Sequence, residues 1–176
     1  GIKVGDKITT DHIMPAGARL KYRSNIPLYS TFVFEGVDKE FPARCIERRD
    51  RGVANFIVAG QSYGQGSSRE HAALCPMYLG VKAVLALSIE RIHQANLCNA
   101  GILPLTLQSE EDYEKISPDD SLVIRDVRTQ VASGKPITLE NVTKGYSFTC
   151  TLDVTELQRD MLLKGGRLNQ IKETLV

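Results

Sequence analysis

The sequence predicts one mixed α/β domain that spans residues 1–176. Two apolar segments rich in β-branched residues, 53–59 and 81–87, are each followed by a segment with helical character. Such alternation is typical of strands joined by helices. A length of 176 residues with 42% hydrophobic content suits a single core. Because the sequence has no internal repeat and no low-complexity linker, we expect one domain.

The N-terminal quarter is expected to be mostly irregular. Residues 5–17 are rich in turn formers and hydroxyl groups and show no periodicity, which indicates an ordered loop. Pro27 is expected to end whatever precedes it, and residues 31–34 are expected to form a short strand. Arginines and acidic residues alternate over 44–51, which favours a solvent-exposed face of mixed charge.

The middle of the chain shows the clearest alternation. Strands are expected at 53–59, 81–87 and 102–107, and helices at 69–79 and 89–99. Ser88 stands where it can cap the second helix, and Gly101 where that helix should end. Pro104 indicates an edge strand or a strand start, because proline cannot donate a hydrogen bond to a neighbouring strand.

The C-terminal third is predicted to be mostly β. Strands are expected at 121–127, near 129–131 and at 146–152, and helices from Ser109 to before Pro118, from Thr155 to Leu163 and near the C-terminus. Thr155 and Gln158 form a capping box for the middle one of these helices. The last helix would bury Leu168, Ile171 and Leu175, which are spaced three and four residues apart.

Composition argues against several classes of protein. The formal net charge of +1 does not predict attraction to nucleic acid or to a membrane surface. The sequence holds no apolar run long enough for a membrane span and does not open on a signal peptide. Since the first residue is Gly1, we expect an excised domain or a processed fragment that has lost a partner segment.

The cysteines and histidines do not predict a metal site in this chain. The spacing of the four cysteines excludes a zinc knuckle or a cluster-binding run. We expect buried thiols in a reducing cytoplasm, and therefore a cytoplasmic protein. The three histidines are also scattered. These residues are Cys45, Cys75, Cys98, Cys150, His12, His71 and His93.

The glycine-rich segment 60–71, GQSYGQGSSREH, is the main candidate site. Its glycines permit turns and the close approach of a ligand. Ser67, Ser68 and Arg69 follow where a helix should start, and the free N–H groups of a helix start attract anions. The segment therefore predicts an anion site that contains a hydroxyl group.

Two other interpretations of this segment are weaker. The letters GQSYG match the nucleophile elbow of serine hydrolases through Ser62, but more glycines stand where the helix should begin. No acid and histidine follow in the order and spacing of a triad. A phosphate-binding loop is physically plausible, yet neither the P-loop pattern nor a full dinucleotide-binding glycine pattern is present.

A third interpretation makes Ser67 a general base. A serine hydroxyl can serve as a base only where donors and a cation stabilise its alkoxide form, and helix N–H groups with Arg69 could do so. Arg69 and Arg23 are candidates to grip a carboxylate through paired hydrogen bonds. Taken singly, these residues fit simpler roles equally well: Ser67 or Ser68 as a helix cap, and Arg23 as a surface charge.

Four blocks together resemble the aconitase superfamily. In family order they are TTDHIMPAG at 9–17, LKYR at 20–23, GQSYGQGSSREHAA at 60–73 and IERIHQAN with NAGILPL at 89–105. The match is to the C-terminal swivel domain of aconitase, whose counterpart is the separate small subunit of isopropylmalate dehydratase. The resemblance implies a sheet or barrel-like core with flanking helices. TDHI and KYR look more like aconitase than like the dehydratase subunit.

The resemblance also implies roles for individual residues. Ser67 matches the catalytic base, and Asp11 matches an active-site acid that helps to orient the site. Ser68, Arg69 and Arg23 match positions that bind substrate carboxylates. Arg23 is the main discriminator between aconitase and isopropylmalate dehydratase. His12 and His71 lie inside matching motifs and are expected to have structural or supporting roles.

As implied by the resemblance, the chain would be part of a hydro-lyase of the tricarboxylic acid cycle that interconverts citrate and isocitrate. The family's 4Fe–4S cluster lies on other domains, where one iron takes the substrate hydroxyl. This chain would be inactive without those cluster-bearing domains. The alternatives are the small subunit of an isopropylmalate or homoaconitate enzyme and, in a different class, a stand-alone carboxylate-, phosphate- or RNA-binding module.

Overall fold

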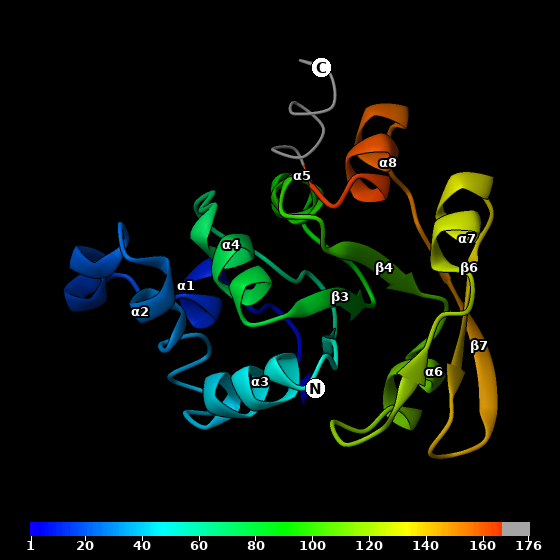
Figure 1. Cartoon of the computed structure of the whole chain (residues 1–176), viewed down its shortest axis with the longest axis horizontal. Coiled ribbons are helices and arrows are strands. Elements are labelled where there is room, and N and C mark those ends of the chain that lie inside the picture. The colour runs from blue at the N-terminus through cyan, green and yellow to red at the C-terminus, as the bar shows by residue number, and fades with distance from the viewer. Residues whose placement is uncertain (167–176) are drawn as a thin grey trace.

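The computed structural model describes residues 1–166, which form a curled seven-stranded sheet flanked by helices (Figure 1). The strand order is β1-β2-β3-β4-β7-β6-β5. The parallel strands are β1 (Ile2–Lys3), β2 (Asn55–Ala59), β3 (Val81–Ala86) and β4 (Leu103–Leu107). The antiparallel strands are β5 (Leu122–Val123), β6 (Ile137–Asn141) and β7 (Tyr146–Thr151). The predicted mixed α/β class with a barrel-like sheet is confirmed.

The parallel strands β2, β3 and β4 are mostly apolar because both faces of the sheet are covered, and Lys82 is an exposed exception in β3. Ile57 and Val84 lie in one hydrophobic cluster, whereas Val58 and Leu85, their neighbours in sequence, lie in a second cluster. Successive side chains of a strand point to opposite faces, so these two clusters occupy the two sides of the sheet. The mostly apolar runs at 53–59 and 81–87, interrupted by Asn55 and Lys82, are the consequence.

Helices complete the two clusters. In chain order they are α1 (Thr10–Ile13), the 3-10 helix η1 (Gly17–Tyr22), α2 (Ile26–Ser30), α3 (Phe41–Asp50), α4 (His71–Tyr78), α5 (Arg91–Asn99), α6 (Glu110–Lys115), α7 (Val127–Ser133) and α8 (Glu156–Leu163). In Figure 1 helices α1 to α4 lie to the left of β4, α6 and α7 lie on the right-hand side, and α8 lies above β4. Within residues 1–166, no helix combines the length and the apolar character that a membrane span requires.

Several predicted elements are confirmed with their end signals. Thr155 and Gln158 form the capping box of α8, and Ser109 caps α6. Helix α5 ends before Gly101. The φ of Gly101 is +75°, in the left-handed region that glycine adopts without steric strain. Pro104 lies at the start of β4, before pairing with β7 begins at Thr106, so the missing donor leaves no ladder bond unmade on that side.

The N-terminal expectations were partly wrong. Residues 10–13 form a helix within the expected loop, since Thr9 accepts a hydrogen bond from the backbone of His12, whose ring accepts one from Thr9 in return. Pro27 lies in the first turn of α2, where a missing N–H does no harm, rather than ending an element. Residues 44–50 of the charged segment lie on α3, and Arg51 is its C-cap residue.

Two predicted strands are absent from the described structure. Residues 31–34 form turns that continue α2, and Phe34 has a φ of +56° while its N–H donates to the carbonyl of Ile13. Residues 129–131 lie in α7, where the Gln130 side chain bonds both N–H and C=O of Thr138. Of the strand expected at 121–127, only β5 forms. The last predicted helix, with Leu168, Ile171 and Leu175, lies outside the described residues.

Candidate functional site

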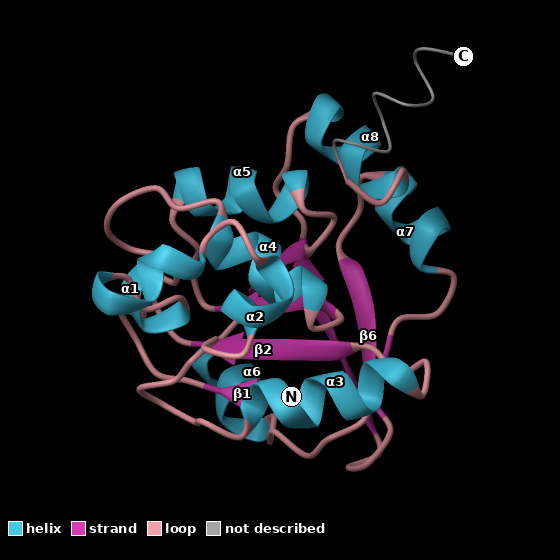
Figure 2. Ribbon diagram, turned by 60° about the vertical axis from the view of Figure 1, so that its left-hand side comes forward, coloured by secondary structure: helices cyan, strands magenta, loops and turns pink. Residues whose placement is uncertain are grey.

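The glycine-rich segment lies beside residues 5–10 at the carboxyl end of the parallel strands. The N–H groups of Gly64 and Gln65 donate to the carbonyl of Ile8, and the N–H of Thr10 donates to the carbonyl of Gln65. Helix α1 therefore sits near the carboxyl end of β2 (Figure 2). Crevices at the carboxyl ends of parallel strands are common ligand sites in α/β proteins.

Gly64 is required both for its backbone conformation and for the space that it leaves. Its φ is +89°, and a Cβ atom there would lie 2.4 Å from Cγ of His93. No side chain fits at that distance, so the turn packs directly on the imidazole ring of His93. Gly66 has a φ of +96°, and its nearest neighbour to a Cβ would be Thr10 Oγ1 at 3.7 Å.

Ser67 is exposed and is not a helix cap. Helix α4 begins at His71, with Glu70 at its N-cap position and no capping side chain. The expected helix start at Arg69 was therefore two residues early, and the interpretation of Ser67 or Ser68 as caps is wrong. The carbonyl of Ser67 accepts a hydrogen bond of 2.9 Å from Thr10 Oγ1, which ties the turn to α1.

The backbone N–H groups of residues 66–69 donate to no other group in the described part of the chain. Residues 66–68 are exposed, and consecutive N–H groups without a partner are available to an anion or to a developing negative charge. The sequence predicted these N–H groups at a helix start, but they lie in the turn that precedes α4. The donors that a serine base needs are therefore close to Ser67 in sequence.

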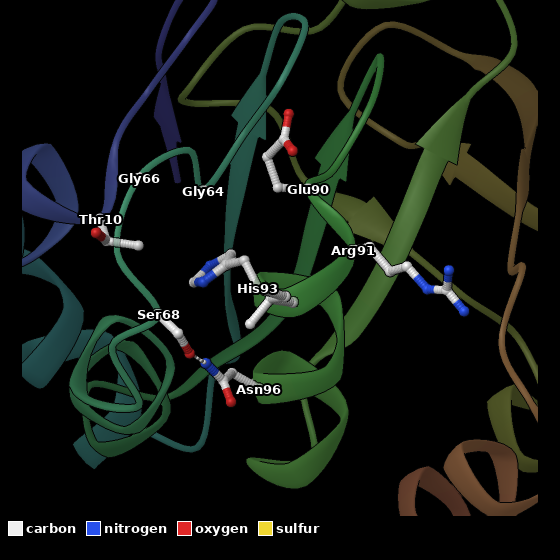
Figure 3. A pocket seen from close by; sticks show the side chains of 9 residues that line it. Thr10, Gly64, Gly66, Ser68, Glu90, Arg91, His93 and Asn96 are labelled. Atoms are coloured by element: carbon white, nitrogen blue, oxygen red, sulfur yellow. Dashed lines mark hydrogen bonds between the residues drawn. The ribbon is translucent and has the colours of Figure 1, made fainter.

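A hollow of about 320 Å³ opens beside Ser68, between the glycine-rich turn and α5. Nδ2 of Asn96 lies 3.4 Å from Oγ of Ser68, across the hollow from Thr10 (Figure 3). The side chain of Arg91 extends away from the hollow. The other lining residues are Gly64, Gly66, Glu90, Ile92 and His93.

Asp11 and Arg69 are brought together in an ion pair between Oδ1 and Nη1. The Arg69 side chain is 26% exposed and the Asp11 side chain is 62% exposed. The pair joins the first turn of α1 to the residue that follows Ser68. Two of the residues singled out from the sequence therefore meet, although 58 positions separate them.

Arg23 is exposed and lies just after η1. Within residues 1–166, its side chain makes no ion pair and no hydrogen bond. Its backbone carbonyl accepts a hydrogen bond of 2.9 Å from Nε2 of His71. The structure therefore connects Arg23 to α4 through its backbone and leaves its guanidinium free of partners among these residues.

The serine-hydrolase interpretation is wrong for Ser62. Its φ is +58°, but its N–H donates to Oγ of Ser88, which in turn donates to Gln61. No histidine of the described chain bonds to Ser62. Ser88 is consequently not the cap of α5, whose N-cap residue Glu90 makes no side-chain capping bond.

His93 and Tyr63 form a buried polar pair under the turn. Their rings meet edge to face with centroids 5.3 Å apart, and neither finds a hydrogen-bond partner for its side chain among the described residues. Burial lowers the pKa of His93 to about 4 and raises the pKa of Tyr63 above its usual range. Both groups are therefore uncharged at neutral pH.

The described residues of this chain do not fit an iron–sulfur cluster. They contain no group of three or more histidine, cysteine or acidic side chains placed to hold a metal. All four thiols are buried, and burial raises the pKa values of Cys45 and Cys75 to about 11 and those of Cys98 and Cys150 to about 12. Thiolates, the form that binds iron, are disfavoured here.

Some contacts of this site were not predicted from the sequence. The bonds from Thr10 to Ser67, from Asn96 to Ser68 and from His71 to Arg23 all join segments far apart in the chain. The donors Thr10, His71 and Asn96 all lie inside the sequence blocks that resemble the family, which was the available signal. Their partners depend on the tertiary fold, which spacing alone does not reveal.

Comparisons with known proteins agree on one family. Residues 10–110 match the family model of the aconitase C-terminal domain. The chain is 38% identical to a probable mitochondrial aconitate hydratase of Caenorhabditis elegans, over 98% of this chain and 25% of that protein. It is 35% identical to the mitochondrial aconitate hydratase of Saccharomyces cerevisiae, over 97% of this chain and 25% of that protein.

Two further matches point to related enzymes. A mitochondrial homocitrate dehydratase of Saccharomyces cerevisiae is 34% identical over 97% of this chain and 25% of that protein. The crystal structure of a 3-isopropylmalate dehydratase from Methanocaldococcus jannaschii superposes with a TM-score of 0.77 at 29% identity, covering 98% of this chain and 91% of that one. The chain spans about a quarter of the length of the curated relatives it matches. It belongs to the aconitase C-terminal domain family.

Proposed function

We propose that residues 1–176 are one swivel domain of an aconitate hydratase, a hydro-lyase that interconverts citrate and isocitrate through cis-aconitate. The observation that carries the proposal is the placement of the Asp11–Arg69 ion pair beside the exposed Ser67. This turn also offers N–H groups with no partner in the described structure. A cation, a hydroxyl and free donors are what a serine base acting on a carboxylate substrate requires.

The proposed roles follow from this geometry. Ser67 takes the proton from the carbon next to a substrate carboxylate, and the N–H groups of the turn and Arg69 stabilise the charge on its oxygen while it does so. Arg69, Ser68 and Arg23 bind carboxylates. Asp11 fixes the orientation of the Arg69 guanidinium, which has five N–H donors and retains free ones after pairing. Two arginines suit a tricarboxylate.

The partner in this proposal is the cluster-bearing remainder of a longer polypeptide, or a separate large subunit. The matched relatives are about four times as long as this chain, which leaves room for such domains. A 4Fe–4S cluster would reside there, because the described residues of this chain do not fit one. The proposal includes no membrane and no nucleic acid. A cytoplasmic location is a prediction from the sequence alone, and the named relatives are described as mitochondrial.

The alternative within the class is the small subunit of a 3-isopropylmalate or homoaconitate dehydratase. The structural neighbour and the homocitrate dehydratase relative favour it. The exposed Arg23 favours the citrate enzyme, because a second guanidinium matches an additional carboxylate better than an apolar group. The ratio of kcat/KM for citrate to that for isopropylmalate distinguishes the two functions.

The role of Ser67 is tested in the full-length enzyme with Ser67→Ala. We expect kcat for citrate to fall by about 100-fold or more with little change in KM, since the base acts in the transition state. Ser62→Gly is the matched control, because glycine accepts the positive φ of that position. It should leave kcat within about twofold. Near-normal turnover of the Ser67→Ala enzyme would contradict the proposal.

A further inference from the structure

His71 makes a contact that the proposed roles leave unused. It is the first residue of α4, and its Nε2 lies 2.9 Å from the carbonyl oxygen of Arg23. Because a carbonyl only accepts, the imidazole must carry its proton on Nε2. The His71 ring also meets the ring of Tyr29 on α2 edge to face, with centroids 5.3 Å apart.

Few other hydrogen bonds hold the backbone around Arg23, although the ring of the preceding Tyr22 stacks on that of Phe32 with centroids 5.6 Å apart. The N–H of Arg23 donates to Leu20, and the N–H of Asn25 donates to Tyr22, so these bonds are local. In the described structure, the bond from His71 is the one hydrogen bond that ties the backbone of residues 17–25 to a residue beyond position 35. The Arg19 side chain pairs with Glu35 nearby and does not reach the glycine-rich turn.

The start of helix α4 connects the bond between His71 and Arg23 to the glycine-rich turn that carries Ser67. His71 comes two residues after Arg69, which pairs with Asp11. Residues 69–71 therefore make two long-range contacts: the side chain of Arg69 pairs with Asp11, and the side chain of His71 bonds to the backbone of Arg23. An arginine grips a carboxylate with defined geometry only when the chain that carries it is fixed. An exposed 3-10 turn needs such a fixed point.

We propose that His71 is a positioning residue for Arg23, which sets the place from which the Arg23 guanidinium reaches a substrate carboxylate beside Ser67. This inference rests on the proposed function. His71 does not touch the substrate in this view, and its donor rather than its ring is the part that matters.

Two substitutions separate the donor from the ring. His71→Phe keeps an aromatic ring against Tyr29 but loses the N–H, whereas His71→Gln keeps an N–H near the position of Nε2 but loses the ring. In the full-length holoenzyme, His71→Phe should raise KM for citrate by about 3- to 10-fold with kcat changed by less than about 2-fold, the effect of one lost hydrogen bond on binding. His71→Gln should restore KM to within about 2-fold. If His71→Gln raises KM as much as His71→Phe, a donor at this position does not restore binding and the inference is overturned. If His71→Phe leaves KM unchanged, the ring and not the donor matters, and the inference is overturned as well.

A double variant tests whether the effect passes through Arg23. With Arg23→Ala already present, His71→Phe should raise KM no further, because coupled residues do not contribute independently. Multiplying effects would overturn the inference. If Arg23→Ala alone leaves KM for citrate unchanged, the carboxylate role of Arg23 fails, and that failure belongs to the proposed function.

Hydrogen exchange gives a measurement that does not depend on turnover. In the full-length protein, backbone amides of residues 19–25 should exchange faster in His71→Phe than in wild type or His71→Gln, because the anchor of the turn is lost. Equal exchange in all three proteins would overturn the anchoring role. This result is independent of whether Arg23 binds citrate.

Discussion

Arg69 is oriented before any ligand arrives, because Asp11 already holds one side of its guanidinium. The Asp11 carboxylate is 62% exposed, so water screens the pair and its contribution to folding is small. Its value lies in fixing a donor fork next to Ser67, where a freely rotating side chain would lose entropy on binding. The acid assigned to Asp11 from the sequence thus acts, in our proposal, through Arg69 and not as a proton donor.

His93 predicts a pH dependence of stability at the residue scale. Burial lowers its pKa in the folded chain from 6.5 to about 4, so the unfolded chain binds the extra proton between these values. The free energy of unfolding should therefore fall as the pH drops from about 7 to 4, by about 3 kcal/mol from this residue. Urea unfolding of the 176-residue chain at both pH values measures it.

The control for this prediction is His93→Phe, which keeps a ring under the turn but cannot be protonated. Acidic residues also titrate in this range, so the informative quantity is the difference between wild type and variant. That difference should shift by about 3 kcal/mol between pH 7 and pH 4 in favour of the variant. An unchanged difference would mean that His93 is not buried in its neutral form.

At the scale of elements, the sequence predicted best where periodicity and end signals agree. Strands β2 and β3 and helix α8 were predicted because their apolar runs or capping boxes are local features. Residues 31–34 look like a strand by composition, but Phe34 is buried against Phe41, which folds the segment back as turns. Tertiary packing overrides β-propensity there.

The same limit applies to α7 and to the site. Val131 suggested a strand, yet it is a buried residue of α7. The bonds between Gln130 and Thr138 fix this helix, and the local sequence pattern does not predict them. For the candidate site, the family blocks predicted roles for Asp11, Ser67 and Arg69, and these roles stay predictions. The sequence placed the donors at a helix start, whereas the structure places them in the turn before α4, because Glu70 is the N-cap residue.

The glycine-rich turn predicts a steric effect that a matched control can isolate. Gly64→Ala would place a Cβ atom 2.4 Å from the His93 ring at a φ of +89°. Gly145 has a φ of +71° but nothing within 4 Å of its Cβ position. Both alanine variants pay about 1 kcal/mol or more for the left-handed backbone, and only Gly64→Ala adds a clash of about 1–3 kcal/mol.

Urea unfolding of the 176-residue chain measures both losses. We expect Gly64→Ala to lower the free energy of unfolding more than Gly145→Ala by at least about 1 kcal/mol. Equal losses in the two variants would show that the turn can move away from His93 without strain.

At the scale of the whole molecule, two apolar clusters on opposite faces of the sheet give this chain a core of its own. The candidate site, in contrast, lies at the exposed carboxyl end of the strands. Ser67 and Asp11 are exposed there, and Arg23, whose carbonyl bonds to His71, is exposed as well. In the proposed function this exposure means that the chain supplies one wall of the site, because the exclusion of water that strengthens contacts to a substrate needs a second wall.

The burial of the four thiols predicts that the isolated chain will not assemble an iron–sulfur cluster. Each is buried, and burial raises the pKa values of the thiols to about 11 or 12, so thiolates are scarce at neutral pH. Cys45 and Cys75 lie in one hydrophobic cluster and Cys98 and Cys150 in the other, on the opposite face of the sheet. Incubation of the folded 176-residue chain with iron and sulfide should therefore leave no stoichiometric iron bound after gel filtration and no hydratase activity.

The full-length protein treated in the same way is the comparison, and it should gain both iron and citrate turnover if the cluster resides on the remaining domains. Denaturing the isolated chain before incubation is the internal control, because unfolding exposes the thiols and permits iron to bind non-specifically. If the folded chain retains iron in stoichiometric amount, the proposal that the base lies on this chain and the cluster on other domains is contradicted. In that case one domain would carry both the base and the metal, and this chain would supply more than one side of the active site.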